Sequence, residues 1–241
     1  MIQSTDAEAA HRHARLAGAL YLVIMVGGVV AEGYVRGAVY VSDDAVATAQ
    51  RLLASTRTYR IGGAVEFVTL GCDLAVAVLL YRLLRAGQPT LALLAATFRV
   101  VFVAIFAVLS LAHFAALLLL QGGPTLDAFT PAQLQQAAHF SLRLHTLGFI
   151  IADVFFGVHC VLLGLLIVRA PYLPRVLGRM LVVAGACYLL DSLAFLTVPD
   201  WRARLFPWLL LPGFVAEGAL ALWLTAKGVN AAAWPGSDAR V

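Results

Sequence analysis

Five ionisable side chains lie at nearly the same depth in five different hydrophobic stretches of the chain. Each is about seven or eight residues from the same end of its stretch, which places it roughly 10 to 12 Å below one membrane surface at a rise of about 1.5 Å per residue. A charged group at the centre of a span costs on the order of 2.5 to 3.5 kcal/mol, so five at one depth favour a shared polar pocket. The five residues are Glu32, Glu66, His113, His145 and Asp191.

A second group of ionisable residues is expected deeper, so that polar side chains form a column from this layer toward the membrane centre. Its members are Asp73, Asp153, Glu217, Arg99 and His159. At roughly 100° per residue, Glu66 and Asp73 share one helix face, and His145 lies within about 40° of His159.

One chemistry for these residues is metal binding. Two imidazoles beside carboxylates suit zinc or non-haem iron, and the candidate ligands are His113, His145 and Glu66. Every candidate comes from a different helix, so no local ligand spacing supports the site. A two-haem arrangement is disfavoured because the residue fourteen positions before His113 is Arg99 rather than a second histidine, and a single haem is a minor alternative.

The other chemistry is metal-free acid-base catalysis on a lipophilic molecule. An apolar wall disfavours the ionised form of a carboxylic acid, so a buried carboxyl group can carry a proton to such a substrate. In this hypothesis Asp73, Glu217 and His145 are catalytic. The pocket around them is formed by Glu32, Glu66, Asp191, Asp153, Arg99 and His159.

The structural alternative is that these groups only hold helices together. Glu32 could pair with Arg36 one turn later, and Arg99 with Asp73 or Glu217. Such interhelical contacts are usually worth less than 2 kcal/mol each. The acid-base hypothesis fails if no pocket exists and every carboxylate is paired within the protein.

The elements that must position these residues are membrane-spanning helices. The chain has 241 residues, 62% hydrophobic and 12% charged, whereas a soluble domain carries about 25% charged residues. Stretches of around 20 apolar residues can cross a membrane, and six are present. They lie near Arg15 to Tyr40, Thr58 to Leu84, Thr90 to Leu120, Ala138 to Val168, Pro174 to Val198 and Leu205 to Lys227. We therefore expect an all-α polytopic bundle forming one transmembrane domain over residues 1–241.

Two local signals mark helices outside these spans. Ser42, Asp43 and Asp44 precede a segment from Ala45 to Thr58 with apolar residues at helical spacing, which predicts an amphipathic surface helix between the first two spans. The run from Thr130 to Gln133 has an N-cap, a proline at the first helical position and a glutamine that closes a capping box. The fourth helix is therefore expected to begin before its membrane span.

Basic residues predict the orientation. They are more numerous on the side of the N-terminus, so the positive-inside rule places both termini in the cytoplasm and the five-residue layer toward the outside of a plasma membrane. The inner set is Arg12, Arg15, Arg82, Arg85, Arg169, Arg175, Arg179 and Lys227, against Arg51, Arg57, Arg60, Arg202 and Arg204 opposite. The net charge of +4 is explained by arginines facing lipid headgroups, and no nucleic-acid motif is present.

The chain resembles a family of small bacterial membrane proteins, domain-of-unknown-function family 4386, from Arg15 to Val229. The matching stretches are Arg15-Leu16-Ala17-Gly18 with Tyr21-Leu22, Glu32 with Val35-Arg36, Cys72-Asp73, Leu94-Ala95-Ala96 with Phe98-Arg99, His145, Phe155-Phe156-Gly157 with His159, Tyr172-Leu173-Pro174 with Leu177-Gly178, Tyr188-Leu189 with Asp191-Ser192, and Glu217 with Leu222-Trp223-Leu224. His113 departs from the family pattern, which has a neutral polar residue there. The resemblance implies the fold and no mechanism, because the family has no established activity.

Three functions follow as alternatives. The leading one is an enzyme or binding protein for a small lipophilic molecule such as an isoprenoid or lipid. The second is a proton-coupled transporter with a relay through Asp73, Asp153, His159 and Glu217. The third is a structural or assembly subunit. The sequence leaves open whether the protein is an enzyme, whether it holds zinc or iron, and its oligomeric state.

Overall fold

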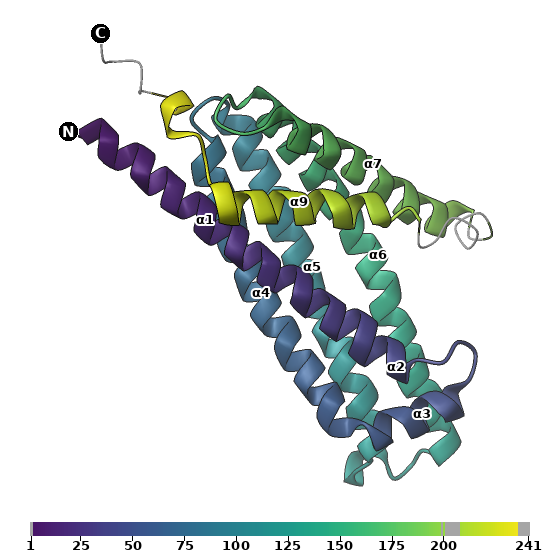
Figure 1. Ribbon diagram of the computed structural model, residues 1–241. Helices are drawn as coiled ribbons and strands as arrows, with labels where there is room; N and C mark the ends of the chain where they lie inside the picture. Colours follow the sequence, from purple (N-terminus) through teal and green to yellow (C-terminus); the bar gives the residue numbers. More distant parts are fainter. Residues whose placement is uncertain (1, 199, 201–207, 236–241) are drawn as a thin grey trace. The chain divides into compact units, whose positions relative to one another are not determined.

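The computed structural model describes residues 2–198, 200 and 208–235, and all regular structure in these residues is helical (Figure 1). The main helices are α1 (Ile2–Gly28), α2 (Gly37–Val39), α3 (Ala45–Ala54), α4 (Thr56–Leu84), α5 (Pro89–Gln121), α6 (Pro131–Arg169), α7 (Arg175–Thr197) and α9 (Leu211–Lys227). A π-helix, Val29–Arg36, joins α1 to α2, and short 3-10 turns occupy Pro124–Leu126 and Ala231–Ala233.

Five helical stretches are long and apolar enough to cross a membrane. They are Ala7–Val39, Thr56–Leu84, Pro89–Gln121, Pro131–Arg169 and Arg175–Thr197. These coincide with the first five predicted spans. For the sixth, α9 has 17 residues, or about 25 Å of helix, which is short of a hydrocarbon core of roughly 30 Å. The expected start of that span at residue 205 lies outside the described residues.

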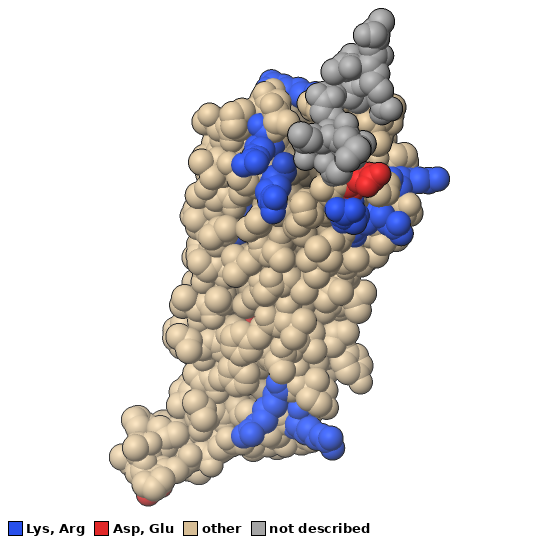
Figure 2. Space-filling model, turned by 90° about the vertical axis from the view of Figure 1, so that its left-hand side faces the viewer, with Lys and Arg blue, Asp and Glu red and all other residues tan. Residues whose placement is uncertain are grey.

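The surface has the apolar character of a lipid-facing protein. Large hydrophobic side chains are exposed along several of the long helices, among them Val26, Leu111, Leu118 and Phe140, each more than 60% exposed. On the face drawn in Figure 2, Lys and Arg side chains gather in groups, and most of the surface carries no charged residue. Water-soluble monomers rarely expose apolar patches of this extent. The chain is a multi-pass membrane protein.

Side-chain caps set the start of two helices. Thr130 and Gln133 form the predicted capping box, because the Thr130 backbone N–H donates to Gln133 Oε1 at 2.8 Å and the Gln133 N–H donates to Thr130 Oγ1 at 3.3 Å. Asp44 caps α3 by accepting from the Ala47 N–H at 2.8 Å. The helix after this cap ends at Ala54, earlier than the predicted Thr58, because Ser55 leaves the helical conformation and α4 begins at Thr56.

The described chain divides into two compact units. The first unit comprises Met1–Val23, Cys72–Val103 and Ile151–Val241, and the second comprises Ile24–Gly71 and Ala104–Ile150. The helices α1, α4, α5 and α6 thus contribute to both units. The expectation of one transmembrane domain over residues 1–241 remains a prediction.

Glycines let α6 and α7 approach closely within the first unit. A Cβ on Gly164 would lie 2.5 Å from the Gly178 carbonyl oxygen, and one on Gly178 would lie 2.5 Å from the Gly164 oxygen. A Cβ on Gly185 would likewise lie 2.5 Å from the Gly157 oxygen. Small residues at such crossings allow backbone-to-backbone packing between membrane helices. Gly33, in contrast, has no atom of another helix within 4 Å of its Cβ position among the described residues.

In the second unit, a core cluster holds α3 against the long helices. Leu52 of α3 and Tyr59 of α4 are fully buried there, together with Val35 and Val39 of the first span. α5 and α6 complete it with Ala116, Leu117, Ala138 and Leu142. This packing fixes the connection between the first two spans and, with it, the segment that carries Glu32 and Arg36.

Candidate functional site

Arg36 is the centre of a buried polar cluster in the second unit, the Arg36 cluster, which consists of Glu32, Arg36, Glu66 and His113. The guanidinium donates to both oxygens of Glu32, through Nε at 2.9 Å and through Nη2 in a shorter contact. Nη2 also donates to Glu66 Oε2 at 2.6 Å, and Nη1 donates to His113 Nδ1 at 2.7 Å. One cation therefore binds two carboxylates from different helices.

The contacts of His113 define its protonation. Its Nδ1 faces Arg36 Nη1, which can only donate, and its Nε2 is 3.2 Å from the Tyr59 carbonyl oxygen, which can only accept. The ring is consequently a neutral imidazole with its hydrogen on Nε2. The Tyr59 ring stacks on it with 3.8 Å between centroids, and the Tyr59 hydroxyl donates to the His113 carbonyl oxygen at 2.8 Å. Both ring nitrogens are thus engaged.

His145 lies beside the two carboxylates. Ligand atoms of Glu32, Glu66 and His145 all lie within 4.8 Å of one another. The His145 side chain is 1% exposed, and its Nε2 has no hydrogen-bond partner among the described residues. Glu66 Oε1 accepts from the Ser110 hydroxyl at 2.6 Å. The group of possible metal ligands that the structure brings together contains Glu32 in place of His113.

A second polar cluster, the Arg99 cluster, lies in the first unit and consists of Tyr21, Asp73, Arg99, His159 and Glu217. Arg99 is completely buried and donates through Nε to Asp73 Oδ1 at 2.5 Å. Its Nη1 is 3.1 Å from His159 Nε2, and its Nη2 has no partner within the described part of the chain. The guanidinium lies over the Tyr21 ring, 4.6 Å from the centroid, which is cation–π geometry.

His159 is neutral for the same reason as His113, because one ring nitrogen faces a carbonyl oxygen and the other faces an arginine. In His159 the donor is Nδ1 and the acceptor is Nε2, the reverse of His113. Its Nδ1 is 2.8 Å from the Ala95 carbonyl oxygen and must donate, so Nε2 is the acceptor that faces Arg99. In both clusters a histidine thus serves as a neutral acceptor for a buried arginine. Each cluster contains two carboxyl groups for one guanidinium.

Glu217 differs from Glu32, Glu66 and Asp73 because no ion pair joins it among the described residues. It accepts instead from two tyrosine hydroxyls, Tyr21 at 2.9 Å to Oε2 and Tyr188 at 2.6 Å to Oε1. Glu217 is 8% exposed, whereas Tyr188 is only partly buried. Tyr188 packs against Gly213, where an added Cβ would meet its hydroxyl and ring. The Tyr188 hydroxyl therefore lies between the Glu217 carboxyl group and Gly213 of α9.

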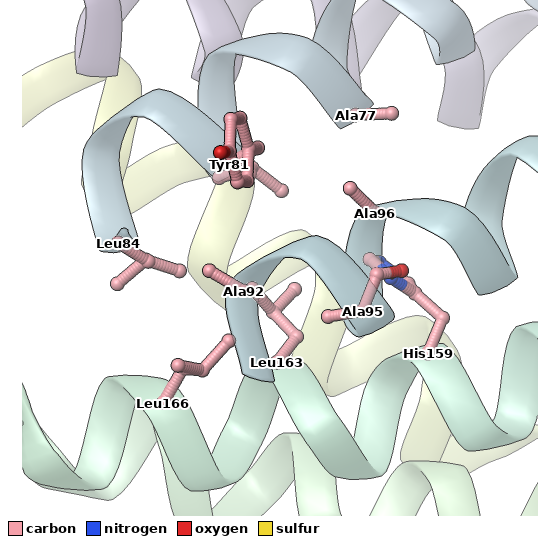
Figure 3. A pocket seen from close by; sticks show the side chains of 10 residues that line it. Ala77, Tyr81, Leu84, Ala92, Ala95, Ala96, His159, Leu163 and Leu166 are labelled. Atoms are coloured by element: carbon pink, nitrogen blue, oxygen red, sulfur yellow. The ribbon is translucent and has the colours of Figure 1, made fainter. Parts of the chain in front are cut away.

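A small cavity adjoins the Arg99 cluster (Figure 3). It lies among α4, α5 and α6 and is lined by apolar side chains with His159 at one side. Its lining residues are Ala77, Leu80, Tyr81, Leu84, Ala92, Ala95, Ala96, His159, Leu163 and Leu166. About 10 Å³ is open to the centre of a water molecule, which is room for about one water.

The residues singled out from the sequence divide between the units. The second unit brings together four of the five outer residues, Glu32, Glu66, His113 and His145, and the first unit brings together Asp73, Arg99, His159 and Glu217. Asp191 belongs to the first unit, where it is buried on α7, and Asp153 is buried on α6. Glu32 is paired with Arg36 and Asp73 with Arg99, as the structural alternative expects, and Glu66 is also paired with Arg36.

Sequence reasoning overlooked the partners that complete each cluster. Tyr21, Tyr59 and Tyr188 all bind a cluster residue, yet tyrosine is ordinary in membrane helices. Ser110, which binds Glu66, does have a signal in the sequence, since it lies three residues before His113 and so close to its helix face. The π-helix that carries Glu32 and Arg36 has no such signal.

A family model described as a domain of unknown function, DUF4386, matches residues 16–228. The chain belongs to this family. All members of both clusters lie within the range matched to DUF4386, so they are part of the family domain. An uncharacterized protein of Archaeoglobus fulgidus is similar, with 30% identity over 165 residues that cover 67% of this chain and 80% of the relative. No solved structure matches.

Proposed function

We propose that this DUF4386 protein is a six-span protein of the plasma membrane with both termini in the cytoplasm, and that residues 1–241 form one transmembrane domain. The proposal adds α9 to the five long apolar helices as part of a sixth span. The excess of arginines on the side of the N-terminus supports the orientation, and α3, with its apolar face buried, would lie at the outer surface.

Within the membrane, the protein acts on a small lipophilic molecule, an isoprenoid or lipid, by acid-base chemistry at Glu217. The observation that carries this proposal is the pair of tyrosine hydroxyls that meet on a buried carboxyl group without an ion-pair partner among the described residues. A carboxyl group in this setting can hold a proton, or give it up while two O–H donors stabilise the carboxylate. Those are the two states that a general acid or base must alternate between.

The neighbouring residues have separate roles in this proposal. Asp73 balances the charge of Arg99, whose fully buried guanidinium is a fixed cation over the ring of Tyr21. The partly exposed Tyr188 gives the route by which a lipophilic molecule reaches Glu217. Phe156 packs edge-to-face on Tyr188, with 5.6 Å between ring centroids, and offers an apolar wall to such a molecule.

Deuterium exchange tests this proposal with a mixture of candidate substrates. Purified protein in lipid vesicles prepared in D₂O is incubated with a bacterial total lipid extract and a polyprenol mixture, and the lipids are analysed by mass spectrometry. Wild type should introduce deuterium into a carbon position of at least one lipid, or convert it to a product of shifted mass. Glu217→Gln should abolish the change and Tyr188→Phe should slow it.

The matched control is Tyr34→Phe, because Tyr34 is 70% exposed and lies outside both clusters. This variant should behave as wild type. Equal labelling by Glu217→Gln and wild type, or no labelled or converted lipid with wild type, would contradict the proposal. A purely structural or assembly role predicts the second of these results, together with normal folding of Glu217→Gln.

A proton-coupled transporter is the second candidate, and the cavity beside His159 favours it. The cavity has room for about one water molecule and reaches from His159 to Leu84 and Leu166, near the C-terminal ends of α4 and α6. The corresponding experiment loads vesicles with a pH-sensitive dye and imposes solute gradients from a broad panel. Solute-dependent proton flux that Glu217→Gln abolishes supports transport, and the absence of flux across the panel excludes it for those solutes.

A further inference from the structure

We propose that Glu32, Glu66 and His145 form a binding site for a divalent transition-metal cation of the zinc type. The site lies in the second unit and goes beyond the proposed chemistry at Glu217, which belongs to the first unit. Two carboxylates and one imidazole come from three different helical segments, yet their ligand atoms lie within 4.8 Å of one another. Zinc bonds to carboxylate oxygen and to imidazole nitrogen are about 2.0 to 2.2 Å long, so a small inward shift of these side chains would bring all three donors onto a single ion.

His145 supplies an independent reason to expect a ligand. A buried imidazole nitrogen without a hydrogen bond costs free energy, and native proteins rarely leave one. Nε2 of His145 has no partner among the described residues, although the residue is only 1% exposed. The neighbouring His113 shows the contrast, because both of its ring nitrogens are hydrogen-bonded.

The carboxylates retain the capacity to bind a cation although Arg36 already contacts both. An ionised carboxylate has about four lone-pair sites on its two oxygens. Glu66 uses one site for Ser110 and one for Arg36, and Glu32 uses one site on each oxygen for Arg36. About two sites remain on each carboxylate. Arg36 and Ser110 thereby orient the two carboxylates, as hydrogen bonds to metal ligands generally do.

The charge of the cluster favours a divalent cation that also binds a water molecule. Two carboxylates and one guanidinium, with a neutral His113, leave one uncompensated negative charge in a buried site. A divalent cation reverses this to one positive charge, and hydroxide in place of its bound water brings the site to neutrality. Three protein ligands with an open fourth position are the arrangement of catalytic rather than structural zinc sites.

The path into the site runs past Glu32. Its side chain is 34% exposed, whereas that of Glu66 is 2% exposed. Glu32 also lies in the π-helix Val29–Arg36, and such irregular helical turns are frequent at functional sites. A cation can therefore meet Glu32 first and then the buried pair, Glu66 and His145.

Zinc binding to the whole, metal-stripped protein in detergent tests the proposal. Equilibrium dialysis against zinc, followed by elemental analysis, should give one zinc per chain for wild type, and cobalt in its place should give a visible absorption spectrum. His145→Ala and Glu66→Gln should lose the ion. His139→Ala is the matched control, because His139 is a buried histidine of the same unit whose Nε2 is bonded to the Val41 carbonyl oxygen, and it should bind zinc normally.

A further variant keeps the test decisive if a ligand variant does not fold. Ser110→Ala removes only the hydrogen bond to Glu66 and should weaken zinc binding about 10- to 100-fold. Wild type that binds no zinc, or zinc that is retained in both His145→Ala and Ser110→Ala, overturns the site. Neither result contradicts the deuterium exchange expected at Glu217, because Glu217 belongs to the first unit and the proposed zinc ligands belong to the second.

Discussion

The guanidinium of Arg99 donates through Nη1 to Nε2 of His159, across 3.1 Å, in a site that excludes solvent from both side chains. The carbonyl oxygen of Ala95 holds the other ring nitrogen and so keeps the histidine neutral. Arg36 and His113 repeat this arrangement in the second unit through the opposite ring nitrogens. Each buried arginine is thus stabilised by a carboxylate and by a neutral acceptor that adds no charge.

The ion pair between Asp73 and Arg99 should behave as a buried pair. Asp73→Asn leaves the Arg99 cation without its counterion and should lower the free energy of unfolding by about 3 to 5 kcal/mol. The double variant Asp73→Leu with Arg99→Met removes both charges and should be markedly more stable than Asp73→Asn. Thermal unfolding in detergent measures both. If the single and double variants lose equal stability, the pair does not act as a coupled unit.

The glycine contacts between α6 and α7 should be sensitive to a single methyl group. Gly164→Ala places a Cβ against the Gly178 carbonyl oxygen and should destabilise the protein by about 1 to 3 kcal/mol through overpacking. Gly71→Ala is the control, because in the part of the chain that the structure describes no atom of another helix lies within 4 Å of its Cβ position on α4. That change should stabilise the helix by roughly 0.5 to 1 kcal/mol. Melting temperatures of the two variants should therefore shift in opposite directions.

The start of α3 should depend on one side chain. Asp44→Ala removes the cap on the Ala47 N–H and should cost about 0.5 to 2 kcal/mol. Asp43, the preceding residue, has φ of 58°, so Asp43→Gly should be neutral or stabilising. Hydrogen exchange of the α3 amides measures the difference. Equal protection of α3 in Asp44→Ala and wild type would show that core packing alone holds this helix.

Because the Tyr172 side chain is buried, we expect the folded protein to lose stability at alkaline pH. It lies in the turn between α6 and α7, donates to the Leu83 carbonyl oxygen at 2.8 Å and packs on Trp234. Burial raises the pKa of Tyr172 to about 12, whereas an unfolded tyrosine has a pKa of about 10. Between these values the unfolded state loses its proton first, so stability falls as pH rises from about 10 to 12. Tyr172→Phe should reduce this loss, as measured by unfolding at a series of pH values; an unchanged slope would contradict it.

Helix positions were predictable because they follow from apolar run length and from caps such as Thr130 and Gln133. Membrane depth also indicated that Glu32, Glu66 and His145 are near one another. The partners that satisfy each group depend on helix rotation and on side-chain reach, which a single sequence does not specify. The assignment of Asp191 to the first unit and the contacts of Tyr21 and Tyr188 with Glu217 are results of that kind.

The π-helix Val29–Arg36 also has a consequence for how DUF4386 chains should be compared. An i to i+5 turn contains one more residue than an i to i+4 turn, so such a segment is equivalent to a one-residue insertion in an α-helix. In a homologue that is one residue shorter between positions 28 and 37, this segment would be a regular α-helix. The residues that correspond to Glu32 and Arg36 would then lie on a different face of that helix. A single gap at this place in an alignment would therefore distinguish members that assemble the Arg36 cluster from those that do not.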